Sequence, residues 1–188
     1  MNVLALDIET KNYSHEIGGW GNTHMFQVST VCTWDGSNGT VYIDEPIGSI
    51  RKSGVVVKPL SQLKYDLDDH HQNGGVLLGH NIVSFDLAVL KKYLDDKSYI
   101  DTSRILNKQY GERYSLSNLV QHTLGADKLM DSADAPVVWK AGRYTEVADY
   151  CLKDCELVYD LWIHGKEHSV VKGFSIEEEK MKELEVKW

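Results

Sequence analysis

Residues 3–8, VLALDI, form an apolar run rich in branched side chains, which is typical of a strand in the interior of a sheet. Because side chains alternate along a strand, Asp7 and Glu9 share one face, while Leu6 and Ile8 share the other. Two carboxylates therefore emerge side by side where a buried strand ends. Like charges this close repel each other, and burial strengthens the repulsion. A group of opposite charge is therefore needed to offset the repulsion between the two carboxylates.

Length, composition and charge restrict the class of protein. With 188 residues, 42% hydrophobic and 26% charged, the chain can form one ordinary domain with a substantial core. No run is long or apolar enough to span a bilayer and Met1 leads straight into a strand, so we expect no membrane partner and a cytoplasmic location. Three cysteines without a CxxC spacing favour reduced thiols. The net charge of −8 argues against a sequence-independent nucleic-acid coat, but not against an enzyme that reaches phosphates through bound cations.

Strand and helix signals alternate along the chain. Residues 26–34 and 40–43, joined by DGSNG, predict two strands that form an antiparallel trio with the first, and 76–81 predict a further strand. Helical patterns occupy four segments: 61–72, 84–95, YIDTSRILNKQY after a strand end, and SLSNLVQHTLG, which Gly125 stops. Residues 126–142 show no regular pattern. The order of elements predicts an α/β fold with a mixed sheet flanked by helices.

The longest helical pattern covers residues 143–164. Its inward stripe is apolar and consists of Val147, Tyr150, Cys151, Val158 and Leu161. Asp154 falls in the middle of this stripe, although an unpaired carboxylate facing a core is costly or picks up a proton. Tyr150 lies one turn earlier on the same face.

The last part of the sequence allows two interpretations. HSVVKGF and ELEVKW alternate well enough to pair as two strands, whereas SIEEEKMKEL is equally compatible with a helix. We favour the hairpin. The expected organisation is then a main domain over residues 1–165 and a C-terminal extension over 166–188 that packs on it.

Four acids from three separate elements can converge. Asp86 begins a predicted helix just after a strand, where a helix N-terminus favours an anion, so a helix-start acid is a sufficient structural explanation when it is taken alone. Strand ends and helix starts are also where α/β sheets place their sites. Together with Asp7, Glu9 and Asp154 it forms a set of hard oxygen ligands that suit Mg²⁺ or Mn²⁺ rather than zinc. Two such ions would neutralise the acids, and metal pairs roughly 4 Å apart catalyse in-line phosphoryl displacement.

These residues lie in three short motifs that occur in order: Asp7-x-Glu9, Asn81-x-x-x-Phe85-Asp86 and Tyr150-x-x-x-Asp154. They resemble the exonuclease motifs of the DEDD 3′–5′ exonucleases, the superfamily of RNase D, the Werner-type exonuclease and the proofreading domains of DNA polymerases. Tyrosine in the third motif corresponds to the DEDDy branch. YIDTSRIL, YSLSNLV and WKAGRYTEVADYCLKDCELVYDL also look like segments of polymerase-associated and helicase-associated members.

The resemblance implies an RNase H-like fold and a 3′–5′ exonuclease that uses two Mg²⁺ or Mn²⁺ ions to release nucleoside monophosphates from nucleic-acid 3′ ends. Asp7 would bridge both ions, Glu9 and Asp154 would complete the site that activates water, and Asp86 would support the second ion. Tyr150 would orient the attacking water, since an unperturbed phenol titrates near ~10. The implied partners are a single-stranded nucleic acid with a free 3′ end and a replication or repair protein.

Substrate-binding residues are also implied by the resemblance. Thr10 and Asn81 would hold the terminal nucleotide, and Phe85 would pack near its sugar or base. The residues themselves also permit a turn role for Thr10, a cap for Asn81 and a core position for Phe85. Asp101 is interpreted as a helix cap, and the five tryptophans are treated as core. Other side chains are assigned more weakly: Cys151 and Cys155 as core thiols, and Lys11, Lys140 and Arg143 as surface cations that could meet a phosphate backbone.

Two alternative functions remain open at this point. One is an RNase H-like endonuclease on a related fold, and the other is a non-catalytic module that docks on a polymerase or helicase. Tyr150, one turn before Asp154, favours the exonuclease over the endonuclease. A complete set of four acids favours an enzyme over a module.

Overall fold

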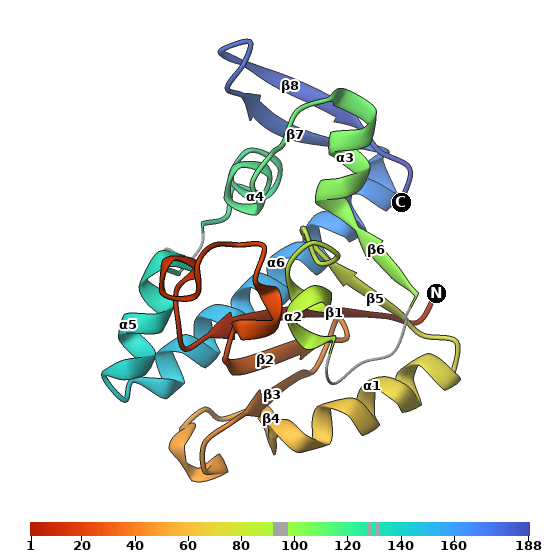
Figure 1. Ribbon diagram of the computed structural model, residues 1–188. Helices are drawn as coiled ribbons and strands as arrows, with labels where there is room; N and C mark the ends of the chain where they lie inside the picture. The colour runs from red at the N-terminus through yellow and green to blue at the C-terminus, as the bar shows by residue number, and fades with distance from the viewer. Residues whose placement is uncertain (92–97, 128, 131) are drawn as a thin grey trace.

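A six-stranded mixed sheet forms the centre of the computed structural model, which describes residues 1–91, 98–127, 129–130 and 132–188 (Figure 1). Its strands lie in the order β4-β3-β2-β1-β5-β6, with β1 Val3–Thr10, β2 Val28–Trp34, β3 Gly39–Ile43, β4 Val55–Pro59, β5 Val76–Gly79 and β6 Tyr99–Asp101. The pairs β1–β2 and β2–β3 are antiparallel, whereas β3–β4, β1–β5 and β5–β6 are parallel. Helices flank this sheet, so the predicted α/β architecture with a mixed sheet is confirmed.

The predicted antiparallel trio is formed by β1, β2 and β3. The turn between β2 and β3 closes around Asp35, whose carboxylate accepts hydrogen bonds from the backbone N–H groups of Ser37 and Asn38 at 2.8 and 2.7 Å. Strand β4 was not predicted from the sequence. This edge strand has five residues, ends in Pro59 and leaves Val56 exposed, so it lacks the alternation that marks a half-buried strand.

The α-helices are α1 Leu63–Gln72, α2 Asp86–Leu90, α3 Thr102–Tyr110, α4 Leu116–Leu124, α5 Ala135–Lys140 and α6 Tyr144–His168. Five short 3₁₀ helices accompany them in the described residues: η1 Ser14–Ile17, η2 Thr23–Met25, η3 Ile47–Ser49, η4 Leu60–Gln62 and η5 Ser132–Asp134. As predicted, Gly125 ends α4, with φ of 65°. Of the helix predicted at 84–95, α2 is observed, and 92–97 lie outside the described residues. No described helix is both long enough and apolar enough to cross a membrane.

The prediction of irregular structure over 126–142 is wrong for α5. This helix has six residues and begins with Ala135 and Pro136, and proline is well tolerated in the first turn because its missing N–H would have no partner there. Six residues are too few to show a helical period, which explains why this helix was not predicted.

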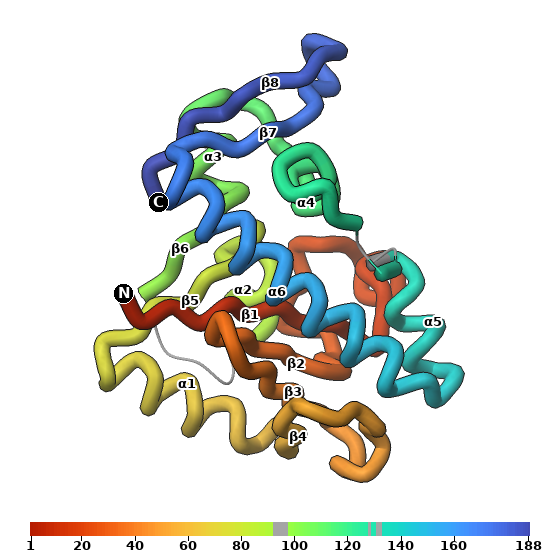
Figure 2. Tube along the Cα trace, turned by 180° about the vertical axis from the view of Figure 1, so that it is seen from behind, coloured from red at the N-terminus to blue at the C-terminus, as the bar shows by residue number. Residues whose placement is uncertain are grey.

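Side chains of β1 alternate between two hydrophobic clusters, one on each face of the sheet. Val3 and Ala5 belong to the cluster beneath α6, whereas Leu6 and Ile8 belong to the cluster shared with α1 and α2. Figures 1 and 2 show α6 on one face of the sheet and α1 and α2 on the other. The predicted alternation is confirmed, and it places the two carboxylates of β1 on the side of α6.

Helix α6 begins one residue after the predicted start and continues one turn beyond the predicted end. The predicted inward residues are buried, and Asp154 among them is 3% exposed. The helix ends at Ser169, which adopts a left-handed conformation with φ of 59°. Near this end, Gly165 leaves room for the indole of Trp188, which donates a hydrogen bond to the carbonyl oxygen of Trp162 at 3.0 Å.

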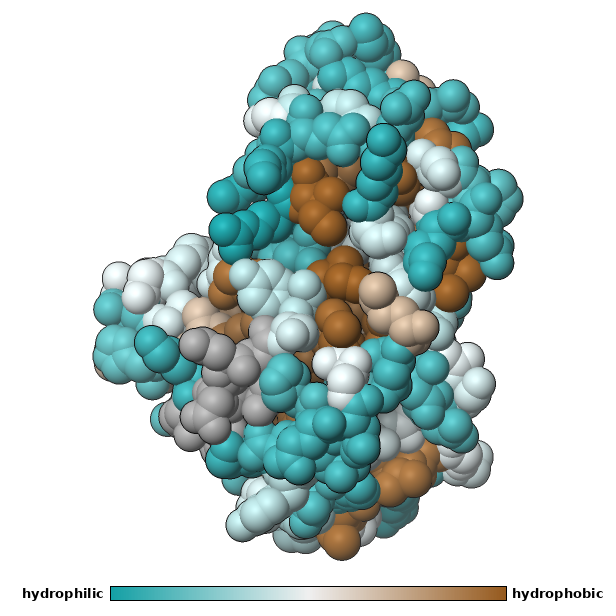
Figure 3. Space-filling model, turned by 90° about the vertical axis from the view of Figure 1, so that its right-hand side faces the viewer, coloured by the Kyte–Doolittle hydropathy of each residue, from teal (hydrophilic) through white to brown (hydrophobic). Residues whose placement is uncertain are grey.

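Strands β7 (Val170–Ser175) and β8 (Lys180–Glu185) form an antiparallel hairpin beside α3 and α4 (Figure 1), rather than the alternative helix. Side chains of α4 pair with the backbone of β7. The Asn118 amide exchanges two hydrogen bonds with Phe174, both 2.8 Å, and the Thr123 hydroxyl exchanges two with Lys172, at 3.0 and 2.8 Å. The hairpin end of the molecule is largely hydrophilic on the face shown in Figure 3.

Candidate functional site

Asp86 is bound to the backbone of the strand that carries Asp7 and Glu9. Strand β5 pairs with β1 only along Val3–Ala5, so the edge of β1 is left without a strand partner on that side beyond this point. The carboxylate of Asp86, at the start of α2, accepts a hydrogen bond from the N–H of Ile8 at 3.1 Å. Asp86 thus supplies the hydrogen-bond acceptor that a neighbouring strand would supply in a longer pairing. The residue is 5% exposed. Its place follows from the early end of β5.

Helix α6 brings Tyr150 and Asp154 onto the same end of β1. Both side chains are buried, and the thiol of Cys151 between them donates to the carbonyl oxygen of Asp7 at 3.3 Å. One turn further, the thiol of Cys155 donates to the carbonyl oxygen of Cys32 in β2 at 3.2 Å. All three cysteines are buried and unbridged, so the interpretation of the α6 thiols as core residues is confirmed.

The electrostatics of the site show which groups lie close together. The pKa of the Tyr150 phenol is raised far above its usual value by burial and then by the charges of Asp154, Glu9 and Asp7. The pKa of Asp86 is raised by burial and then by the charge of Asp7. Charge interactions weaken with distance, so the groups that act on one another in this way lie near each other. The structure therefore brings the four predicted acids and the predicted tyrosine together at the end of β1.

The donor set of this site fits a hard divalent cation. Four carboxylates supply only oxygen ligands, and the pKa of the Asp86 carboxyl is raised first by its burial and then by the charge of Asp7. Within the described part of the chain, no group of three or more histidine, cysteine, aspartate or glutamate side chains is already arranged to hold a metal ion.

A cavity of about 480 Å³ opens beside the acids. Asp7 and Asp154 line it on one side, and Asn81, Arg113 and Asn118 are among the residues on the others. Arg113 lies in the loop between α3 and α4, and its guanidinium group is suited to bind phosphate. The sequence analysis missed this residue. Its signal was present in GERYS, where the arginine lies two residues before the Ser115 that caps α4.

The predicted substrate residues have different surroundings. The hydroxyl of Thr10 donates to the carbonyl oxygen of Asn12 at 2.9 Å, as expected for the turn role. Asn81 is exposed, lines the cavity and has a φ of 68°, and its N–H donates to Asp101 at 2.9 Å. The same carboxylate accepts from the N–H of Arg104, so the predicted cap of α3 is confirmed. Asn81 is therefore the one of the three predicted substrate residues that lines the cavity.

Phe85 belongs to a group of three aromatic rings. Its ring lies edge-on to those of Trp20 and Phe26, with centroids 5.7 and 5.4 Å apart. Phe26 is buried, but Trp20 is 67% exposed. The expectation that all five tryptophans are core is wrong for Trp20, although Trp139 and Trp162 are buried. The glycines around Trp20 in GGWG indicate a loop and could have revealed its exposure.

The three cations that were considered for contact with a phosphate backbone are engaged in ion pairs. Lys11 pairs with Asp44 and Glu45 at 3.0 and 3.6 Å. Lys140 pairs with Glu16 at 3.0 Å, and Arg143 pairs with Glu146 on the next turn of the chain. These pairs are partly exposed, and such pairs hold side chains only weakly.

In comparisons with known proteins, no family model and no curated sequence matches this chain. The chemistry of the site therefore rests on its own residues. Clustered acids beside an open cavity that also carries an arginine can hold cations and meet an anionic substrate. An exposed tryptophan packed on Phe85, next to Asp86 in the chain, adds a surface on which a flat ring can stack.

Proposed function

We propose that the protein is a metal-dependent 3′–5′ exonuclease of the DEDDy type with an RNase H-like fold, acting on single-stranded nucleic acid. The observation that carries the proposal is the gathering of Asp7, Glu9 and Asp154 around the phenol of Tyr150, with Asp86 bound to the same strand. The motif order supports it, as does the six-stranded mixed sheet, in which an antiparallel trio precedes the parallel strands.

In this proposal Asp7, Glu9, Asp86 and Asp154 hold two Mg²⁺ or Mn²⁺ ions, which supply charge neutralisation and a more acidic bound water. Tyr150 remains protonated at neutral pH because its pKa is raised, so its hydroxyl orients the attacking water by hydrogen bonding and does not act as a base. Asn81 and Arg113 face the substrate from the cavity wall. Trp20 stacks on a base.

The proposal is tested with single-stranded DNA and RNA labelled at either the 5′ or the 3′ end, incubated with Mg²⁺ or Mn²⁺. We expect a ladder of progressively shorter 5′-labelled products and early release of the 3′ label as a mononucleotide. Asp7→Asn and Asp154→Asn should abolish hydrolysis, and Tyr150→Phe should slow turnover while cation binding is retained. Full activity of either aspartate variant would contradict the assignment.

A circular single strand separates the exonuclease from the alternatives. We expect the circle to survive under conditions that degrade the linear strand of the same sequence. Cleavage of the circle would indicate an RNase H-like endonuclease. No hydrolysis of any substrate, together with no cation binding by calorimetry, would indicate a non-catalytic module that docks on a replication or repair protein.

A further inference from the structure

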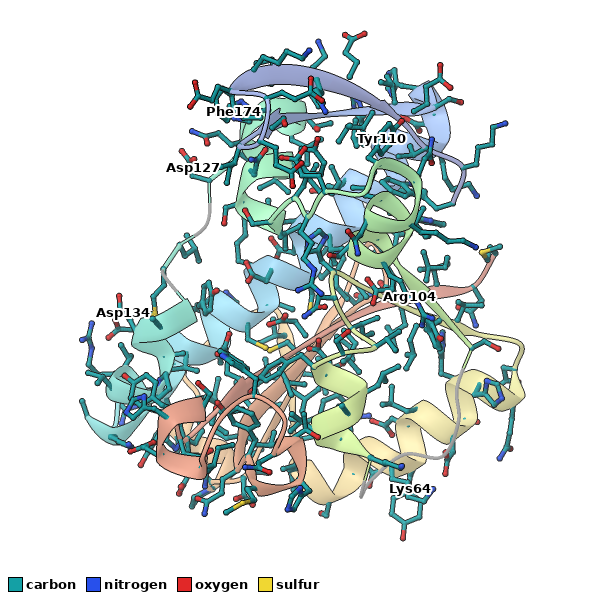
Figure 4. All side chains as sticks on the ribbon, turned by 45° about the horizontal axis from the view of Figure 1, so that its top comes forward. Lys64, Arg104, Tyr110, Asp127, Asp134 and Phe174 are labelled. Atoms are coloured by element: carbon teal, nitrogen blue, oxygen red, sulfur yellow. The ribbon has the colours of Figure 1, made fainter. Side chains whose placement is uncertain are left out.

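The hairpin and the cavity share one structural wall. The segment Glu112–Asn118 covers the loop after α3 and the first turn of α4 and supplies several residues to the cavity, while Ile176 in the hairpin turn lines it as well. Asn118 at the start of α4 is fixed to Phe174 of β7 by two hydrogen bonds. In Figure 4, Phe174 and Tyr110 mark opposite ends of the hairpin, and the Tyr110 hydroxyl donates to the carbonyl oxygen of Glu185 at 3.0 Å. The hairpin is thus attached to α3 and α4 along its length.

Glu112 is the centre of this attachment. Its carboxylate is 6% exposed and accepts hydrogen bonds from Tyr114, Ser175 and the hairpin turn. The distances are 2.7 Å to the Tyr114 hydroxyl, 2.8 and 3.0 Å to the Ser175 hydroxyl, 2.9 Å to the N–H of Ile176 and 3.4 Å to that of Glu177. Burial acts to raise the pKa of Glu112, but the hydrogen bonds from Tyr114 and Ser175 outweigh it and the pKa is lowered. The carboxylate is therefore charged at neutral pH.

Tyr114, whose hydroxyl binds this carboxylate, is also bonded through its backbone to the residue before the second motif. The carbonyl oxygen of Tyr114 lies 2.8 Å from Nε2 of His80, and Nδ1 of the same ring lies 2.9 Å from the Thr102 hydroxyl. His80 lines the cavity and directly precedes Asn81. The Tyr114 ring also packs closely on β7 at Gly173, where an added Cβ would come within 2.8 Å of it. The chain Ser175–Glu112–Tyr114–His80 thus links the hairpin to the loop after β5.

We propose that Glu112 is a positioning residue of the nuclease site, which makes the hairpin a part of that site. Glu112 orders the cavity wall, including Arg113 beside it and, through Tyr114 and His80, the loop that carries Asn81. The inference rests on the proposed function. Since Glu112 itself does not line the cavity and the acids are held by β1, α2 and α6, its loss weakens substrate binding more than it slows hydrolysis.

The test compares Glu112→Ala and Ser175→Ala with Glu183→Gln, a control on the outward face of the same hairpin. Steady-state hydrolysis of a single-stranded oligonucleotide should show KM raised about tenfold in Glu112→Ala, with kcat changed less than about twofold. Ser175→Ala, which keeps the carboxylate and removes one donor, should raise KM by a smaller factor. Glu183→Gln should behave as the wild type. Amide exchange should become faster in residues 79–83 and 113–118 of both alanine variants.

The outcomes separate the two proposals. An active wild type with unchanged KM in both alanine variants overturns the positioning role, and so does a loss confined to kcat. If Glu112→Ala does not fold, Ser175→Ala alone decides. If the wild type hydrolyses no substrate, the proposed function fails. Amide exchange then shows by itself whether Glu112 orders the cavity wall, and unchanged exchange in residues 79–83 overturns that role as well.

Discussion

Asp86 combines two properties that oppose each other. Its carboxylate satisfies the N–H of Ile8, which the early end of strand β5 leaves without a strand partner, yet its charge is buried near that of Asp7. The hydrogen bond stabilises the fold, while the charge destabilises it when no cation is present. The two contributions can be separated experimentally because asparagine keeps an acceptor oxygen and carries no charge.

We therefore expect Asp86→Asn to raise the melting temperature of the metal-free protein by a few degrees while it abolishes hydrolysis; about 1 kcal/mol corresponds to roughly 2–4 °C in a domain of this size. Because the pKa of Asp86 is higher in the folded chain than in the unfolded chain, folding takes up a proton between the two values. The free energy of unfolding of the wild type therefore falls as pH rises through that range, and the variant should lack this contribution. The measurement is a set of melting curves recorded from roughly pH 4 to pH 8, a range in which carboxyl groups of raised pKa titrate. Equal melting temperatures at every pH would contradict the charge argument.

Trp20 is the exposed member of the aromatic group that includes Phe85. Trp20→Ala should weaken binding of a single-stranded oligonucleotide about tenfold, or roughly 1.4 kcal/mol, because it removes one stacking surface. Trp20→Phe, which keeps a ring, should lose less. Fluorescence anisotropy of a labelled oligonucleotide in the Asp154→Asn background measures binding without hydrolysis. Equal affinities of the alanine and tryptophan forms would exclude stacking at this position.

At the scale of elements, α6 depends on close packing at Gly165. A Cβ added there would lie 2.5 Å from the Trp188 indole. Gly165→Ala should therefore lower the free energy of unfolding by about 1–3 kcal/mol, although alanine is the better helix former. In the Trp188→Ala background the same change should become stabilising by up to about 1 kcal/mol. Urea unfolding of the four proteins of this double-mutant cycle gives the coupling directly, and additive effects would contradict it.

The elements that could be predicted from the sequence had either a long repeating pattern or, for the short strands β3 and β5, an apolar run next to a turn signal. The buried run of β1 and the inward stripe of α6 each repeat over several turns or alternations, and both are confirmed. Strand β4 and helix α5 have five and six residues, respectively. They are stabilised by neighbours distant in sequence, such as the parallel pairing of β4 with β3, and local patterns carry no trace of such contacts.

At the scale of the whole molecule, some residues of the candidate site could be predicted from local sequence patterns, and others depend on contacts between distant parts of the chain. Its acids could be predicted because a carboxylate on an inward helix face or at a buried strand end conflicts with its surroundings in the sequence itself. The residues of the cavity wall could not be predicted, because Arg113 and Glu112 lie in a short polar segment that resembles an ordinary surface loop. The role proposed for Glu112 arises from contacts with a hairpin more than 60 residues away, as the separation of 63 residues between Glu112 and Ser175 shows.

Cation binding should stabilise the entire fold, since the acids that would hold the ions come from β1, α2 and α6. At a free Mn²⁺ concentration of about 100 times Kd, we expect a gain of roughly 2.7 kcal/mol. Differential scanning fluorimetry should show a rise in melting temperature of about 5–10 °C. Asp7→Asn should lose most of this rise, and Glu183→Gln should keep it. A rise of the same size in both variants would place the cations elsewhere.

The pairing of Asn118 and Thr123 with the backbone of β7 also affects how the molecule meets copies of itself. An isolated two-stranded ribbon has two open edges, and each can template an added strand from a neighbouring chain. Here amide and hydroxyl groups of α4 occupy one of these edges. The other edge belongs to β8, in which four of the six side chains are lysine or glutamate, and these charges discourage aggregation through strand addition.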